Sequence, residues 1–133
     1  MHTLVAVTFT LEDIDLAHRG VTSATVRQYL ATLHDLGIVS YTTHISDGHS
    51  EYFAGNGDSL CSAAVHERYD VSDQADRDAA RQAIEAHQLK QTDYFTFSRQ
   101  LAAAGVGFWI MDTVRMTCTF CSKADDRLIE DDV

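Results

Sequence analysis

Apolar positions change their spacing along the first third of the chain. Between residues 26 and 36 they recur every three or four residues, which predicts an amphipathic helix. A capping box that begins at Thr10 precedes a shorter apolar run, and it predicts an earlier helix that ends at about Arg19. Thr22 or Ser23 is expected to cap the second helix.

After Gly37, residues 38–45 are rich in β-branched and aromatic side chains, which predicts a strand. Asp47-Gly48 is a strong signal for a two-residue hairpin turn. With this pair as the turn, His44 faces Glu51 on the returning strand. Alternation then divides the hairpin into a core face (Val39, Tyr41, Thr43, Ile45 and Tyr52) and an outer face (Thr42, His44, Ser46, His49, Glu51 and Phe53).

The rest of the chain continues with elements of both kinds. Gly55-Asn56-Gly57 predicts a second turn before a short strand at 59–62, and residues 64–71 form a connector that could include an irregular or edge strand. A long helix is expected from Ser72 or Asp73 to about Lys90, a shorter one from Thr92 or Asp93 to Gly105, and strands at 106–111, 116–122 and 127–130.

The two halves of the chain repeat one pattern, each predicting two helices followed by a three-stranded meander. The pseudo-repeats span about 10–63 and 73–131. We therefore expect an α+β fold in which internally duplicated units form an antiparallel sheet, or two sheets, packed against helices. The matched positions are Tyr29 with Phe97, Leu33 with Leu101, Gly37 with Gly105, Ile38 with Val106, Tyr41 with Trp109, Tyr52 with Phe120, Asp58 with Asp126 and Leu60 with Leu128.

Length and charge restrict the functional classes. The 133 residues fit a single domain, 1–133, with a substantial core. Ten Lys and Arg against twenty Asp and Glu give a formal charge of -10, so the surface repels phosphate backbones and nucleic acid is not an expected partner. The sequence has no stretch typical of a signal peptide or a membrane span, so no membrane partner is expected.

The cysteines Cys61, Cys118 and Cys121 are an odd number in a chain with a large predicted core. This count indicates a reducing compartment, and we expect a cytoplasmic protein. Cys118 and Cys121 form a C-x-x-C pattern, but within a strand this spacing places them on opposite faces. We expect Cys118 to pack beside Trp109 and Phe120 as a small core residue, without a redox or metal role.

Several short motifs occur together: G-I-V-S-Y at 37–41, D-G at 47–48 before H-S-E-Y, T-D-Y-x-T-F at 92–97, A-G-V at 104–106, Trp109 and M-T-C-T at 116–119. With them the chain resembles, over nearly its whole length, the YbcV/YdfO-like family of small uncharacterised bacterial and prophage proteins, sometimes labelled "phage envelope protein". The resemblance implies a single α+β domain and no known catalytic residue. Phe95 stands where the family pattern has proline, which leaves the rigidity of that helix start in doubt.

The outer face of the first hairpin is the best candidate for chemistry. His44, His49 and Glu51 could hold a transition metal with open coordination positions, or act as an acid–base pair. The alternative is a solvated face on which His44 and Glu51 are a simple cross-strand pair. The site depends on register, because a slip of one residue would scatter the three side chains.

Two hypotheses of function follow. The first is a non-enzymatic binding or accessory module with a protein or small-molecule partner, and a homodimer as one possible assembly. It rests on the absence of catalytic and cofactor motifs, for which reason no cofactor is expected. The alternative is a small metal-assisted hydrolase centred on His44, His49 and Glu51. An acidic mimic of nucleic acid is a third hypothesis, which has only net charge behind it.

Overall fold

The computed structural model describes residues 9–21 and 25–133. Within them the chain forms four helices and six strands, which confirms the predicted α+β class. The predicted helix caps Thr22 and Ser23 lie outside the described residues. In chain order the elements are α1 (Leu11–His18), α2 (Val26–Asp35), β1 (Ile38–His44), β2 (Ser50–Ala54), β3 (Ser59–Cys61), α3 (Arg77–Gln88), α4 (Tyr94–Ala103), β4 (Val106–Asp112), β5 (Thr117–Ser122) and β6 (Arg127–Asp132).

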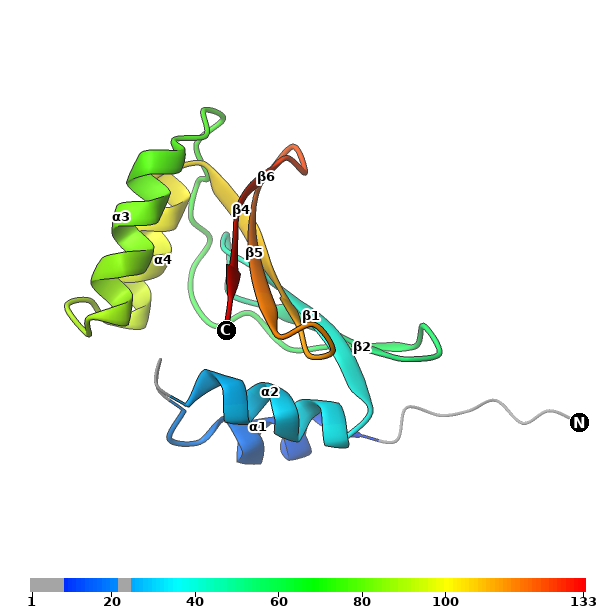
Figure 1. The fold of residues 1–133 in the computed structure, drawn as a ribbon. Coiled ribbons are helices and arrows are strands. Elements are labelled where there is room, and N and C mark those ends of the chain that lie inside the picture. The colour runs from blue at the N-terminus through cyan, green and yellow to red at the C-terminus, as the bar shows by residue number, and fades with distance from the viewer. Residues whose placement is uncertain (1–8, 22–24) are drawn as a thin grey trace, which may run out of the picture.

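All six strands form one antiparallel sheet, in the order β3-β2-β1-β4-β5-β6. From the sequence, the strands could form either one sheet or two sheets. The structure has a single sheet because β1 and β4, the first strands of the two meanders, pair with each other. The helices cover one side of this sheet as two separate pairs, α1 with α2 and α3 with α4 (Figure 1).

The ladder between β1 and β4 is symmetric about the pair formed by Thr42 and Ile110. Tyr41 pairs with Met111, and Thr43 pairs with Trp109, so each pair maps onto the other when the numbers shift by 68 (109 − 41 = 111 − 43 = 68). Tyr41 and Trp109 therefore share the face of the sheet that the helices cover. The order helix, helix, meander is the same in both halves. Descent from one duplicated unit stays a prediction.

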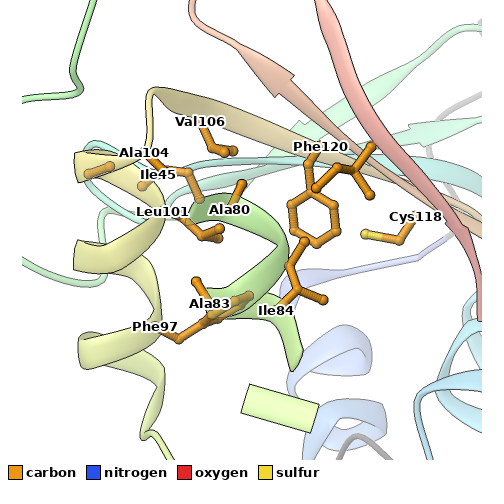
Figure 2. Packing of buried hydrophobic residues seen from close by; sticks show 12 residues of the cluster. Ile45, Ala80, Ala83, Ile84, Phe97, Leu101, Ala104, Val106, Cys118 and Phe120 are labelled. Atoms are coloured by element: carbon orange, nitrogen blue, oxygen red, sulfur yellow. The ribbon is translucent and has the colours of Figure 1, made fainter. Parts of the chain in front are cut away.

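Each helix pair packs over its own half of the sheet in a separate hydrophobic cluster. Leu30 and Leu33 of α2 are fully buried in the first, and Leu101 of α4 is fully buried in the second. In the second cluster Ile84 of α3 packs beside Phe120 (Figure 2). Met111 and Val133 are partly buried and pack against both clusters. The space between the helix pairs thus lies over the middle of the sheet.

Two of the predicted helix starts are confirmed. Thr10 and Asp13 make the reciprocal hydrogen bonds of a capping box at α1. The carboxylate of Asp93 accepts a hydrogen bond from the backbone N–H of Thr96, 2.7 Å away, and caps α4. The caps therefore follow from local side-chain chemistry.

The expectations for the connector and the start of the next helix are wrong. Residues 64–71 form no strand. The cap of α3 is Asp76, which accepts from the backbone of Ala79, and not Ser72 or Asp73. The hydroxyl of Ser72 is already engaged in a local turn as acceptor from the backbone N–H of Gln74. The helix can therefore begin only after this turn.

Gly105 ends α4 with a backbone that other residues rarely adopt, at φ 82°. A Cβ at this position would lie 2.5 Å from the backbone oxygen of Gln74. The glycine therefore both stops the helix and lets the connector before α3 pass close to the chain. Gly37, its matched position, ends α2 with φ 98°.

The register predicted for the first hairpin is wrong by two residues. Glu51 pairs with Thr42, and His44 meets His49 through a backbone hydrogen bond of 2.9 Å. The turn therefore spans four residues, 45–48, where the prediction had two. Ile45 is fully buried and bonds to the backbone of β4, which draws it out of the hairpin ladder. Because the slip is even, the predicted faces largely survive.

One residue departs from the predicted faces. A bulge between Ile38 and Ser40 puts Ile38 in the core, where Val39 was expected.

Candidate functional site

The structure brings together two of the three side chains proposed for the metal site. The rings of His44 and His49 stack in parallel, with 4.4 Å between centroids. Glu51 lies opposite Thr42, and its carboxylate accepts a hydrogen bond from the hydroxyl of Ser59 on β3. Across residues 9–21 and 25–133, no group of three or more His, Cys, Asp or Glu side chains is placed to hold a metal ion.

Asp47 at the turn contacts His49, one of the three residues predicted to hold a metal. Its carboxylate accepts hydrogen bonds from the backbone N–H of His49 and from Nδ1 of the same residue. Burial is the largest single influence and opposes ionisation, but the backbone and side-chain hydrogen bonds from His49 together outweigh it and lower the pKa of Asp47. The pKa of His44 is lowered as well, first by partial burial and then by the neighbouring His49 ring, because both disfavour the charged imidazolium.

The two cysteines of the C-x-x-C pattern are free thiols on opposite faces of β5, as predicted. Cys118 packs in the second hydrophobic cluster next to Phe120 (Figure 2). Burial raises the pKa of its thiol, and nearby Asp131 adds to the rise. Cys118 is therefore a protonated, apolar part of its surroundings and not a nucleophile.

A cleft of about 650 Å³ lies between the two helix pairs, with the middle of the sheet as its floor. Its volume is within the range of small-molecule sites. Every helix contributes to the walls, together with the loop after α1 and the loop between α3 and α4. Its lining residues are His18, Val21, Val26, Tyr29, Tyr41, Ile84, His87, Gln88, Lys90, Thr92, Tyr94, Phe97, Trp109, Met111, Cys118, Phe120, Asp131, Asp132 and Val133.

Aromatic rings form much of the cleft surface. Phe97 of α4 lies between two other rings: His87, which is parallel to it at 4.1 Å, and Trp109, at 6.0 Å and 30°. Phe120 meets Trp109 edge to face. On the other side Tyr29 and Tyr41 meet edge to face at 6.2 Å. The symmetric ladder accounts for this arrangement, since it puts Tyr41 and Trp109 on the floor together.

The indole nitrogen of Trp109 is an unusual polar atom at the cleft. Its indole nitrogen is buried and has no hydrogen-bond partner within the part of the chain that the structure describes. A buried N–H group is normally paired, because its desolvation is otherwise uncompensated. Trp109 lines the cleft, and its covered N–H is a donor that no described residue satisfies.

The remaining polar groups of the lining include two that are tied to neighbours. Asp131 of β6 accepts two hydrogen bonds from the guanidinium of Arg81 on α3, at 2.8 and 3.0 Å. Nδ1 of His87 lies 3.2 Å from the carbonyl oxygen of Thr92. Such contacts fix the side chains that flank the aromatic surface.

The tyrosines of the cleft are not set up as bases. Burial raises the pKa of Tyr29, Tyr41 and Tyr94, so their hydroxyls stay protonated. With Cys118 also protonated, neither phenols nor thiol offers an ionised nucleophile. The arrangement is suited to holding an apolar molecule.

This cleft was not predicted from the sequence. Tyr41 and Trp109 were expected at equivalent positions of the two halves, and these two residues are the signal that was available. No sequence pattern indicated that His87 and Lys90 line the cleft, because this depends on the distance between the two helix pairs.

Comparison with known proteins yields a family but no function. Among curated proteins, none matches this chain. No helix in the described part of the chain is long and apolar enough to cross a membrane. A family model described as "Protein of unknown function (DUF1398)" matches residues 16–132, which include all four helices in whole or in part and all six strands. The chain therefore belongs to the DUF1398 family.

Proposed function

We propose that this protein is a non-enzymatic binding module whose cleft between the helix pairs takes a small apolar molecule. The observation that carries the proposal is an aromatic-lined space of about 650 Å³ over the centre of the sheet. The protonated state of Cys118 and of the buried tyrosines supports binding over catalysis. The metal-assisted hydrolase has no comparable support, since Glu51 is engaged with Ser59.

Titration with N-phenyl-1-naphthylamine, an uncharged dye that fluoresces in apolar sites, tests the proposal. We expect saturable binding of one dye per chain. Val26→Phe adds bulk to the cleft wall and should weaken binding at least tenfold. Val114→Phe is the matched control, because Val114 is 63% exposed and does not line the cleft.

The thermal midpoint of both variants should be measured alongside, so that loss of binding is not confused with loss of fold. Dye binding that does not saturate, or that is equal in the two variants, would contradict the proposal.

A homodimer is a further part of the proposal. This part is supported by the positions of β3 and β6, which lie at the two edges of the sheet. Backbone groups at sheet edges are available for pairing with another chain. The mass in solution, measured by light scattering across a range of concentrations, tests this part. A monomer at every concentration would remove the homodimer and leave the proposed cleft in place.

The other sequence predictions enter here as proposals as well. A cytoplasmic location is supported by three free thiols, two of them buried. The YbcV/YdfO-like affiliation, a prophage origin and descent of the two halves from one duplicated unit rest on sequence motifs and on the repeated order of elements.

A further inference from the structure

The indole N–H of Trp109 is the starting point for the chemistry of the ligand. The nitrogen is shielded from solvent, so bulk water does not satisfy it, and no described residue accepts its hydrogen. An acceptor on a bound molecule would complete this bond. A ligand reaches this covered nitrogen when the indole or a neighbouring ring rotates, and side-chain rotamer changes are common at binding sites.

The rings around Trp109 indicate the shape of that molecule. His87, Phe97 and Trp109 form a run of roughly parallel rings, with interplanar angles of 3° and 30°. Phe120 and Tyr41 border the same floor. A flat aromatic ring can continue such a stack or meet it edge to face, and both arrangements are favourable. An aliphatic chain would gain burial only.

Charge argues against an anionic molecule. The chain carries a formal charge of -10, and Asp131 and Asp132 both line the cleft, Asp131 paired with Arg81. The field of the whole protein therefore disfavours entry of an anion. Lys90 also lines the cleft, but its single positive charge does not offset the negative charge of the protein.

We infer that the cleft binds an uncharged planar aromatic compound with a carbonyl-type acceptor, which takes the hydrogen of Trp109 Nε1. The inference rests on the proposed function, since it names the ligand class of the same cleft. It assigns Trp109 as the residue that determines specificity for the acceptor.

Three naphthalene derivatives test the inference by displacement of N-phenyl-1-naphthylamine. 2-Acetylnaphthalene carries the acceptor, 2-isopropenylnaphthalene has the same shape without it, and 2-naphthoate carries the acceptor with a negative charge. For each compound Kd is measured on the wild-type protein and on Trp109→Phe, which keeps a ring but lacks the N–H. The ratio of the Kd of the isopropenyl compound to that of the acetyl compound should fall about tenfold in the variant.

A second measurement does not depend on the variant. The chain has a single tryptophan, so its indole N–H gives one resolved proton–nitrogen cross-peak. The acetyl compound should move this proton downfield, and the isopropenyl compound should not. The naphthoate should bind more weakly than the acetyl compound.

The possible failures are distinguishable. If the compounds and the dye bind, but the Kd ratio is the same in both proteins and the indole proton moves equally with both neutral compounds, the ligand class is wrong and the cleft remains a binding site. If the naphthoate binds best, neutrality is wrong. If neither the dye nor any compound binds, the proposed function falls together with the inference.

Discussion

Thr42 on β1 and Ile110 on β4 pair at the centre of the sheet, and the ladder on either side of them is symmetric. The same shift of 68 residues relates Leu33 of α2 to Leu101 of α4 (101 − 33 = 68), and both side chains are fully buried. They belong to different hydrophobic clusters. Equivalent positions in separate clusters should respond alike and independently to truncation.

We therefore expect Leu33→Ala and Leu101→Ala each to lower the free energy of unfolding by about 2–5 kcal/mol. In the double variant the losses should add to within about 0.5 kcal/mol, because the two sites share no cluster. Urea denaturation followed by circular dichroism measures all three values. A loss below about 1 kcal/mol at one site only would show that the two halves are not equivalent in packing.

Gly105 provides a second prediction, since its φ is positive and a Cβ there would meet the backbone of Gln74 at 2.5 Å. Gly57 is the matched control, with φ 94° and no atom within 4 Å of the corresponding Cβ position. Gly57→Ala should cost about 1–2 kcal/mol for the left-handed backbone alone. Gly105→Ala should cost about 1–3 kcal/mol more, because the connector must also move.

Thermal or urea unfolding of the two glycine variants measures the difference. Equal losses would mean that the close approach of Gln74 relaxes without cost.

A buried hydrogen bond joins Thr43 and Ser50, which pair across the first hairpin in the observed register. Their hydroxyl oxygens are 2.7 Å apart, and both residues are buried. Thr43→Val should lower the free energy of unfolding by about 1–3 kcal/mol, because the buried hydroxyl of Ser50 loses the hydrogen bond to Thr43. In the double variant with Ser50→Ala the loss should be smaller than the sum of the single losses. A strictly additive result from denaturation curves would contradict this hydrogen bond.

His44 predicts a dependence of stability on pH. Its folded-state pKa lies below the ordinary value of 6.5, because of partial burial and of His49, with Asp47 and Glu51 opposing them. The unfolded chain therefore binds the proton more readily. This contribution is fully present above pH 6.5 and is lost as the pH falls from 6.5 through the folded-state pKa.

The wild-type protein should accordingly lose more stability between pH 7.5 and pH 5 than His44→Gln does. Urea denaturation at the two pH values measures the difference, and the comparison cancels the carboxylates that both proteins share. Equal losses in the two proteins would show that His44 titrates alike in the folded and unfolded chain.

The local part of the fold was predictable from the sequence because its causes are local. Helix caps at Thr10 and Asp93 depend on side chains within three residues of them. The left-handed stops at Gly37 and Gly105 depend on the residue itself. Strand positions followed from side-chain type and alternation, which is why the α+β class was predicted correctly.

The candidate site required contacts between segments that are far apart in the chain. The hairpin register changed because Ile45 bonds to the backbone of Gly107, 62 residues away (107 − 45 = 62). No pattern within residues 38–54 reports this contact. The metal site predicted from that register lost its support for the same reason.

The sequence by itself determined the elements, the order in which they repeat and the match between Tyr41 and Trp109. Only the tertiary structure decided that β1 and β4 join the halves into one sheet, which places these two rings on a common floor below a cleft. The physical reason is the range of the interactions. Caps, turns and periodicity act over a few residues, whereas the cleft arises from packing between the two halves.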